Sequence, residues 1–452
     1  MHVAIITAGG AGMFCGSCMH DNTWARALIK AGAEVTLIPT YTPIRVDEDN
    51  QSSQRVFFGG INIYLEHRWQ FWQRLPRWTT RWLDNPWLLD LATRGAVSND
   101  AKQLGELTLE MLAGDSGPQR QQVEELARFL ADELKPDVIC FSNALLAGAL
   151  SRIKANFFGP VLCTLQGDDI FLDSLTDAYR ARVSEQLSEK AQDFDGFLVH
   201  SDYYRDYMAA RLGLPRERFR KIPLGIEVSD EGEFAESVGG DPAASRSAND
   251  DEFRVGYFAR ICPEKGLHVL IDAFRMLRQR LPNARLIVGG YLGKRDEAWF
   301  EKLRRDARDL GDSFEYIGSP PDHDSKVSFL KTLDVLSVPT VYREPKGLFA
   351  LEAMANGIPV VLPSHGAFPE MLARSGGGVL VEPERPDELA ASLEALLTNP
   401  TNRAHLAKKG RQGVREFFSA AVMARESLAV FEEYLDRPGA RHEAAAEDVD
   451  TA

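Results

Sequence analysis

The segment from residue 338 to residue 370 constrains the fold of this chain more than any other. An apolar run that ends at Pro339 is followed by a short polar turn, a helix that begins near Lys346-Gly347, and a second apolar run from Ile358 to Leu362. The helix is expected to end at Asn356-Gly357, a pair that is typical of helix C-termini. Because continuous apolar strands joined by a helix belong to a parallel sheet that is covered on both faces, the segment predicts an α/β fold.

Two carboxylates, Glu344 and Glu352, lie in this segment, one in the loop after the first strand and the other in the second turn of the helix. Ligands of open α/β sheets bind at the carboxyl ends of the strands, next to this loop. The free N–H groups and the positive dipole end of a helix that begins at Gly347 favour an anion there. Glu352 is placed to accept hydrogen bonds from sugar hydroxyls. On the spacing alone, the favoured interpretation is that Glu344 is solvated and Glu352 only stabilises the helix.

The residues around the two carboxylates resemble a known signature. The string E-PKGLFAL-E-AMANGIPVV is similar to that of retaining glycosyltransferase family 4, whose members have the GT-B fold. The resemblance extends from Met1 to about Leu435. It implies that Glu344 contacts the donor sugar, that Glu352 binds the nucleotide ribose, and that the turn Gly347-Leu348-Phe349 holds the diphosphate.

The chain has 452 residues, which is too long for one hydrophobic core, and two domains are expected. Residues 229–251 are acidic, rich in Gly, Ala and Ser, and lack hydrophobic periodicity, so they are expected to form a flexible linker. The family resemblance implies two Rossmann-like domains that face each other across a cleft, an acceptor domain over 1–228 and a nucleotide-sugar domain over 252–415. It also implies that a helix over 416–435 returns to the first domain, and the tail 436–452 is expected to be disordered.

Composition argues against several classes of protein. The net charge of −14 makes nucleic acid an unfavourable partner. No apolar run reaches the roughly 18 residues that a membrane helix needs, and the N-terminus lacks the basic start and cleavage site of a signal peptide. The five cysteines form no secreted disulfide framework. A cytoplasmic protein with reduced thiols is therefore predicted.

The chain opens with a βαβ pattern around a glycine-rich loop over 8–17. A dinucleotide site fits poorly, because Cys15 stands where the third glycine after Gly10-x-Gly12 should be, and the second strand ends in Pro39 rather than in Asp or Glu. The glycosyltransferase family has a glycine pair just before this helix, and Cys15-Gly16 occupies that place. Gly16 matches the second glycine of this pair, whereas Cys15 differs from the first. The resemblance implies that this loop approaches the donor phosphate or the acceptor.

The pair Cys15-x-x-Cys18 also suggests a redox or metal function. A single pair makes at most half of a zinc site, and His20 alone does not complete it. A helix N-terminus would lower the pKa of Cys18, so thiol reactivity is a further alternative. Simple packing of the loop is the favoured interpretation.

Residues 68–91 hold five of the seven tryptophans of the chain, interleaved with four arginines. The residues are Trp69, Trp72, Trp78, Trp82 and Trp87, with Arg68, Arg74, Arg77 and Arg81. Aromatic rings beside cations suit a membrane interface or an amphiphilic acceptor. An insertion that packs its tryptophans inward and keeps its arginine charges in solvent is slightly favoured. In either case the segment is a candidate for acceptor choice, with peripheral contact to the inner membrane face as the alternative.

Three further candidate residues follow predicted strands. Gln166 stands where most family members have a His that touches the donor sugar, and Gln can donate and accept a hydrogen bond but cannot carry a proton. Arg260 and Lys265 bracket the turn after the first strand of the second domain, and two cations at the carboxyl end of a strand suit a diphosphate. The resemblance implies that this pair binds the donor phosphates.

The expected activity is transfer of a sugar from a nucleotide sugar to a saccharide or lipid-linked acceptor, with retention and without a cofactor or metal. As the donor bond breaks, Arg260, Lys265 and the helix start near Gly347 would stabilise the charge that grows on the diphosphate. The resemblance implies that a phosphate oxygen takes the acceptor proton. Two alternatives remain. One is a nucleotide-sugar epimerase of the same fold, which needs no acceptor. The other is a non-catalytic sugar-nucleotide-binding protein, which the departures at Cys15 and Gln166 would favour.

Overall fold

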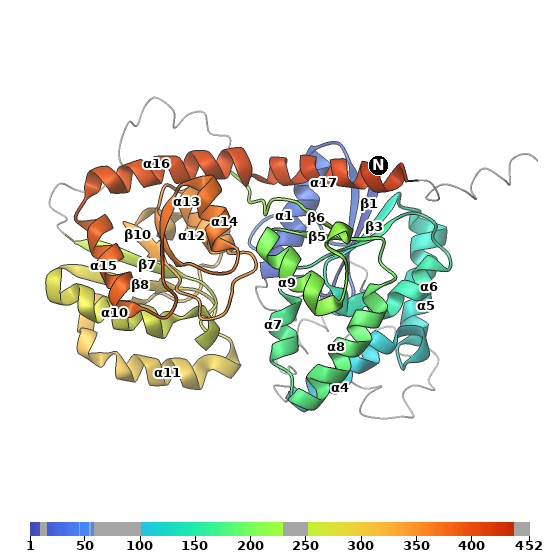
Figure 1. The fold of residues 1–452 in the computed structure, drawn as a ribbon, viewed down its shortest axis with the longest axis horizontal. Coiled ribbons are helices and arrows are strands. Elements are labelled where there is room, and N and C mark those ends of the chain that lie inside the picture. Colours follow the sequence, from blue (N-terminus) through green and yellow to red (C-terminus); the bar gives the residue numbers. More distant parts are fainter. Residues whose placement is uncertain (10–15, 45, 54–55, 58–100, 229–251, 438–452) are drawn as a thin grey trace, which may run out of the picture. The chain divides into compact units, whose positions relative to one another are not determined.

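The computed structural model describes residues 1–9, 16–44, 46–53, 56–57, 101–228 and 252–437. The chain divides into two compact units, one of Met1–Pro223 with Met423–Ala452 and the other of Leu224–Val422 (Figure 1). The segment 68–91, the predicted linker 229–251, nearly all of the predicted tail, and Gly10, Gly12 and Cys15 lie outside the described residues. None of the described helices is both long enough and apolar enough to cross a lipid bilayer.

The first unit is built on a parallel sheet whose described strands have the order β2-β1-β3-β4-β5-β6. The strands are β1 His2–Thr7, β2 Glu34–Pro39, β3 Val138–Phe141, β4 Val161–Thr164, β5 Gly196–Val199 and β6 Phe219–Lys221. Every residue of β3, β4 and β5 is buried. This burial explains their continuous apolar sequences, because helices cover both faces of a parallel sheet.

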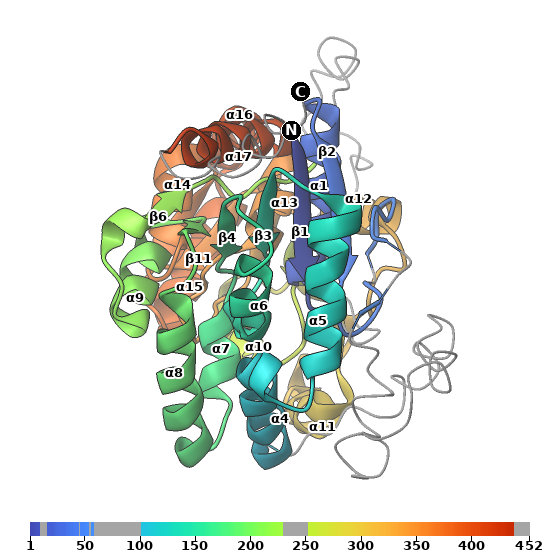
Figure 2. The ribbon, with the colours of Figure 1, turned by 90° about the vertical axis from the view of Figure 1, so that its right-hand side faces the viewer.

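Helices surround this sheet on both sides (Figure 2). They are α1 Gly16–Lys30, α4 Ala101–Ala113, α5 Arg120–Arg128 with a π-helical turn over Phe129–Leu134, α6 Leu150–Lys154, α7 Asp168–Asp173, α8 Asp177–Ala191 and α9 Asp202–Leu212. Short 3-10 turns occupy Gly114–Ser116, Ala144–Ala149 and Arg216–Arg218. The last helix, α17 Ala420–Leu435, also packs on this unit. Trp24 of α1 donates a hydrogen bond from Nε1 to Ser427 Oγ of α17 at 2.9 Å.

The second unit contains a second parallel sheet, with described strands in the order β9-β8-β7-β10-β11-β12. The strands are β7 Phe253–Phe258, β8 Ala284–Gly289, β9 Phe314–Tyr316, β10 Val335–Ser337, β11 Val360–Pro363 and β12 Gly378–Val381. The order of the chain reverses between the adjacent strands β7 and β10. In doubly wound sheets, ligands bind at the carboxyl ends of the strands at such a reversal.

The helices of the second unit are α10 Leu267–Arg280, α11 Glu297–Asp306, α12 His323–Lys331, α13 Leu348–Ala355, α14 Phe368–Ser375, α15 Pro386–Leu397 and α16 Pro400–Phe417. Short 3-10 turns occupy Pro263–Lys265, Lys294–Asp296 and Arg308–Ser313. Helices α10 and α15 pack against each other, and α13 and α14 both pack against α16 on the other side of the sheet (Figure 1). The buried stripe of α10 includes Leu270, Phe274 and Leu277.

The predicted α/β fold is confirmed by these two parallel sheets. The predicted helix at Lys346-Gly347 begins one residue later, at Leu348, with Gly347 as its N-cap and Asn356 as its C-cap. The strand after it is shorter than predicted, because it begins at Val360 rather than at Ile358. This difference changes no assignment of a site residue.

Candidate functional site

The loops that follow β7 and β10 meet at the reversal of strand order in the second sheet. Gly266 has a φ of +74°, and a Cβ at this position would lie 1.8 Å from the carbonyl oxygen of Pro339. Only glycine permits both this conformation and this close approach. The N–H of Val341 donates to the carbonyl oxygen of Glu264 at 2.9 Å, which joins the two loops. The backbone thus fixes the side chains that these loops carry.

The ammonium group of Lys265 lies where the two loops meet. Its Nζ donates hydrogen bonds to the Tyr342 hydroxyl at 2.7 Å and to Oε2 of Glu344 at 2.5 Å. It also lies 5.1 Å from the ring centroid of Tyr342 and 5.3 Å from that of Phe349, distances at which aromatic faces attract a cation. Two of its three N–H donors therefore bind groups in the described part of the chain.

The carboxylate of Glu344 is only 4% exposed, so the alternative that Glu344 is solvated is wrong. Its Oε2 accepts hydrogen bonds from Lys265 and from the Tyr342 hydroxyl. Its Oε1 accepts longer ones from the backbone N–H groups of Gly347 at 3.2 Å and Lys346 at 3.4 Å. Burial alone would raise the pKa of Glu344, but the attraction to Lys265 and the hydrogen bonds from Lys265 and Tyr342 lower it below its ordinary value of 4.5. The side chain is therefore an anion at neutral pH.

Helix α13 begins beside this ion pair. Its N-cap, Gly347, has a φ of +79°, and a Cβ there would lie 2.8 Å from the ring of Phe368. The next two N–H groups, those of Leu348 and Phe349, have no hydrogen-bond partner within the described ranges. The first turn of a helix carries a partial positive charge and attracts anions. Within the described ranges, the turn Gly347-Leu348-Phe349 therefore presents two unpaired N–H donors, those of Leu348 and Phe349, next to the ammonium group of Lys265.

Glu352 lies on α13 and forms an ion pair with Lys326 of α12. The distance from Lys326 Nζ to Glu352 Oε1 is 2.8 Å, and the two side chains are 6% and 16% exposed. The backbone carbonyl of Glu352 accepts a hydrogen bond from the Asn356 side chain at 2.9 Å, which holds the end of the helix. Glu352 therefore does more than stabilise the helix electrostatically.

Arg260 follows β7 by two residues and is exposed. Its carbonyl oxygen accepts a hydrogen bond from the Tyr257 hydroxyl at 3.3 Å, which fixes the backbone of the loop. Within the described ranges, the guanidinium group takes part in no ion pair of 4 Å or less. An arginine in this state can bind a phosphate with two parallel hydrogen bonds at a small cost in lost protein contacts.

In the first unit, Gln166 follows β4 and faces α1. Its Nε2 donates to Oδ1 of Asp21 at 2.7 Å and to the carbonyl oxygen of Ser142 at 3.3 Å. Gln166 is 5% exposed, and Asp21 is completely buried. The next residue, Gly167, donates its N–H to the hydroxyl of Tyr204 at 2.9 Å. The loop after β4 is thus held by buried polar contacts.

Gly16 is the first residue of α1 and is exposed, as a role in ligand contact requires. Cys18 of the same helix is buried, and Cys15 lies outside the described residues. No group of three or more His, Cys, Asp or Glu side chains that could hold a metal ion occurs in the part of the chain that the structure describes. The thiol reactivity considered from the sequence stays a prediction.

The structure brings together five of the predicted site residues: Lys265, Glu344 and the turn Gly347-Leu348-Phe349. Sequence reasoning missed Tyr342, although a hydroxyl two residues before Glu344 in the same loop was a usable signal. It also missed two residues elsewhere. Lys326 lies 5% exposed on α12, and Asp21 lies on the same buried face of α1 as Trp24. A charged residue within an apolar stripe was the signal in both helices.

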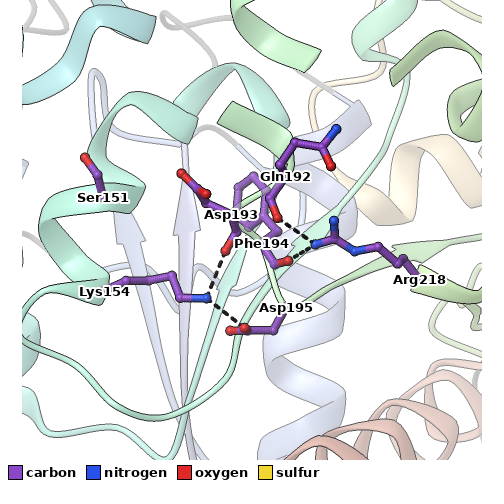
Figure 3. Close-up of a pocket in the computed structure, with 7 residues that line it drawn as sticks. All are labelled: Ser151, Lys154, Gln192, Asp193, Phe194, Asp195 and Arg218. Carbon is purple, nitrogen blue, oxygen red and sulfur yellow. Dashed lines mark hydrogen bonds and ion pairs between the residues drawn. The ribbon is translucent and has the colours of Figure 1, made fainter. Parts of the chain in front are cut away.

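A cavity of about 550 Å³ lies at the amino ends of β4, β5 and β6, at the other edge of the first sheet (Figure 3). It is lined by Ser151, Lys154, Gln192, Asp193, Phe194, Asp195 and Arg218. Lys154 Nζ donates to Asp195 Oδ1 at 2.7 Å, and Arg218 donates to the carbonyl oxygens of Gln192 and Phe194. Because its cations bind the protein itself, this cavity is a site of structural contacts.

Comparisons with known families match both units. Residues 243–413 match the family described as glycosyl transferases group 1, and residues 112–230 match glycosyltransferase family 4.

Three relatives illustrate the similarity in sequence. The uncharacterized glycosyltransferase MJ1607 of Methanocaldococcus jannaschii is 30% identical over 43% of this chain and 48% of that protein. The phosphatidyl-myo-inositol mannosyltransferase of Mycolicibacterium smegmatis is 28% identical over 52% of this chain and 57% of that protein. The chain thus matches about half of the length of these two relatives. The glycogen synthase of Mycobacterium tuberculosis is 30% identical over 66% of this chain and 69% of that protein.

Solved structures support the same fold. A sucrose-phosphate synthase from Thermosynechococcus elongatus superposes with a TM-score of 0.67 at 19% identity, over 96% of this chain and 98% of that one. HepE of Anabaena in complex with UDP superposes with a TM-score of 0.63 at 18% identity, over 96% of this chain and all of that one. With the two parallel sheets and the residues that match the family, these comparisons show that the chain belongs to glycosyltransferase family 4, the glycosyl transferases group 1, and has the GT-B fold.

Proposed function

We propose that this chain is a retaining glycosyltransferase that moves a sugar from a nucleoside-diphosphate sugar to a saccharide or lipid-linked acceptor. One observation carries the proposal: Arg260, Lys265 and the first turn of α13 place cations and N–H donors at the strand reversal of the second sheet. When the donor bond breaks, negative charge grows on the diphosphate. Donors that are fixed before the reaction stabilise this charge without reorganising.

The relatives support the classes of donor and acceptor. HepE was crystallised with UDP, and the relative from Mycolicibacterium smegmatis is a phosphatidyl-myo-inositol mannosyltransferase. A nucleoside diphosphate as the leaving group agrees with the cations around α13. A lipid-linked acceptor agrees with the tryptophans and arginines of the segment 68–91.

The contacts of Glu344 suggest how it would meet the donor sugar. Its Oε1 accepts two longer hydrogen bonds, from Gly347 N–H at 3.2 Å and Lys346 N–H at 3.4 Å. A diphosphate at the start of α13 would compete for these N–H groups. Oε1 would then accept a hydrogen bond from a sugar hydroxyl, while Oε2 keeps its contacts with Lys265 and Tyr342.

The proposed chemistry needs no protein nucleophile. The acceptor hydroxyl attacks the anomeric carbon from the face that the diphosphate leaves, so the new bond keeps the configuration of the old one. The bond between the sugar and the phosphate oxygen breaks with its electron pair on the phosphate, and that diphosphate takes the acceptor proton. The role of the protein is to fix the geometry and to stabilise the leaving charge.

Thermal-shift screening tests the proposal on the whole chain. A ligand that binds only the folded state raises the melting temperature by mass action. We expect one family of nucleotide sugars, and its free nucleoside diphosphate, to raise the melting temperature, and we expect the same donor to label an acceptor. No shift with any uridine, guanosine or adenosine diphosphate sugar would contradict the proposal.

We expect Glu352→Gln and Glu344→Gln to differ in what they impair. If Glu352 binds the ribose, its replacement removes hydrogen bonds to a charged group that are each worth about 1.5–3 kcal/mol, so the affinity for the nucleoside diphosphate falls by about 10- to 100-fold. If Glu344 binds the sugar, Glu344→Gln keeps that affinity and lowers kcat. Calorimetric titration and initial rates separate the two effects.

Glu394→Gln is the matched control, because Glu394 forms an exposed ion pair with Arg280 away from the site. It is expected to change neither the affinity nor kcat. The opposite pattern, in which Glu344→Gln loses the nucleoside diphosphate and Glu352→Gln keeps it, would mean that the two roles are exchanged.

A further inference from the structure

The orientation of the Gln166 amide follows from its neighbours. Nε2 faces Oδ1 of Asp21 at 2.7 Å and the carbonyl oxygen of Ser142 at 3.3 Å. A backbone carbonyl only accepts hydrogen bonds, and Oδ1 of Asp21 accepts here too, so both contacts use the NH₂ end of the amide. Any contact between this amide and a substrate is then made by Oε1, which also only accepts.

We propose that Asp21 is a positioning residue for glycosyl transfer: it locks the amide of Gln166 so that Gln166 offers a hydrogen-bond acceptor to a substrate hydroxyl. The proposal rests on the function proposed above. This role of Asp21 would explain how Gln166 can function at a position where the family commonly has a His. Like the ring of that His, the amide of Gln166 would have a fixed orientation, but an amide cannot carry a proton.

The burial of Asp21 has a cost that packing alone does not explain. The residue is 0% exposed on a helix whose buried face also carries Trp24 and Leu28. Its Oδ2 is buried and has no hydrogen-bond partner among the described residues. A buried carboxylate with incomplete hydrogen bonding destabilises the folded state relative to a neutral side chain of the same shape. A functional role for Asp21 would account for this cost.

Several titratable groups surround this carboxylate. His20 Nδ1 lies 3.4 Å from Oδ1 of Asp21, and the ring of His200 meets that of His20 edge-on at 4.6 Å. Burial raises the pKa of the Cys140 thiol to about 12, with a further contribution from the charge of Asp21. Cys140 therefore stays neutral.

Asp21→Asn tests the proposal directly. Asparagine can present an N–H instead of an oxygen to Gln166, so the amide can lose its shorter contact, and of the two contacts only that with the Ser142 carbonyl at 3.3 Å then still holds its orientation. We expect the melting temperature to stay the same or rise, the affinity for the nucleoside diphosphate to stay the same, and kcat to fall by about 10- to 100-fold, as for a misplaced reacting group. A fall in the melting temperature with unchanged kcat would show a structural role and overturn the proposal.

A double-mutant cycle shows whether Asp21 acts through Gln166. Asp21→Asn is expected to have little further effect on kcat in a Gln166→Ala protein, whereas two independent residues would give multiplied losses. Asp195→Asn is the control, because Asp195 is a carboxylate just before β5, at the opposite edge of the sheet from Gln166, where it pairs with Lys154 (Figure 3). If the wild type transfers no sugar, the proposed function fails. If it transfers sugar and Asp21→Asn does so at the same rate, only this inference fails.

Gln166→His provides a further measurement, the pH profile of kcat, which Asp21 would not affect if its role were only structural. A His beside the carboxylate of Asp21 would have a raised pKa, because an opposite charge stabilises the imidazolium. In this variant we expect a new limb in the pH profile of kcat, which reports the pKa of the introduced His. When Asp21→Asn is added, the midpoint of that limb should shift to lower pH by about one unit or more. His20 and His200 are present in all variants, so the comparison isolates the effect of Asp21. A limb that Asp21→Asn leaves in place would contradict the proposed contact.

Discussion

Lys265→Met is expected to reduce glycosyl transfer by about 10²–10³-fold and to lower the free energy of unfolding by about 3–5 kcal/mol. The loss of transfer follows from the proposed role of Lys265 as one of the cations that bind the leaving diphosphate. The loss of stability follows because Glu344, only 4% exposed, would keep a buried charge without its partner at 2.5 Å. Initial rates and urea unfolding measure the two effects.

The double variant Lys265→Met with Glu344→Gln separates these two causes. It removes the uncompensated charge, so the free energy of unfolding should return close to that of the wild type, because a buried ion pair is often worth little more than a neutral pair of similar shape. Transfer should not return. A double variant as unstable as Lys265→Met would show that the ammonium stabilises the fold by packing rather than through Glu344.

The same pair predicts a dependence of stability on pH. The pKa of Glu344 is lower in the folded protein than its ordinary value of 4.5, because the charge and hydrogen bonds of Lys265 and the hydrogen bond of Tyr342 outweigh the effect of burial. The folded state therefore binds this proton less readily than the unfolded state. The contribution to stability is complete above pH 4.5 and is lost as the pH falls through the folded pKa. The difference in stability between the wild type and Glu344→Gln should shrink over that range.

Arg260→Ala is expected to abolish measurable binding of both the intact donor and the free nucleoside diphosphate, with little loss of stability. Arg260 is exposed and forms no ion pair within the described ranges, so the fold does not depend on its side chain. A bidentate arginine contact with a phosphate is a strong, charge-assisted hydrogen bond. Calorimetric titration of the free nucleoside diphosphate measures the loss.

Arg280→Ala serves as the control, since Arg280 is an exposed arginine of the same unit that pairs with Glu394 at 2.6 Å. Its affinity for the nucleoside diphosphate should equal that of the wild type. A folded Arg260→Ala protein with the same affinity would remove Arg260 from the phosphate site.

Much of the second unit could be predicted from the sequence, because its signals are local. The apolar runs predicted the buried strands, and Gly347 and Asn356 predicted the two ends of α13 to within one residue. The order of the strands in the sheet could not be predicted from local signals. Arg260 and Glu344 follow two different strands, and only the observed order shows that these strands are adjacent.

The contacts between distant residues could not be predicted. Lys326 precedes Glu352 by 26 residues and Asp21 precedes Gln166 by 145, and only the packing of the fold brings these pairs within 2.8 Å and 2.7 Å. The spacing alone favoured a solvated Glu344, which was wrong, because its burial depends on contacts of Lys265 and Tyr342 that the spacing does not show. The predictions for the segment 68–91 and the linker 229–251 concern residues outside the described ranges and stay predictions.

Nuclear magnetic resonance of the whole chain with uridine and guanosine diphosphate sugars, with and without candidate acceptors, tests the central claim most directly. Phosphorus spectra follow release of the nucleoside diphosphate, and proton spectra follow the sugar and the configuration at its anomeric carbon. We predict that one donor releases its nucleoside diphosphate faster when an acceptor is present, and that the new glycosidic bond keeps the configuration of the donor. A donor that is converted to an epimer without release, a donor that binds without turnover, or a product of inverted configuration would contradict the account.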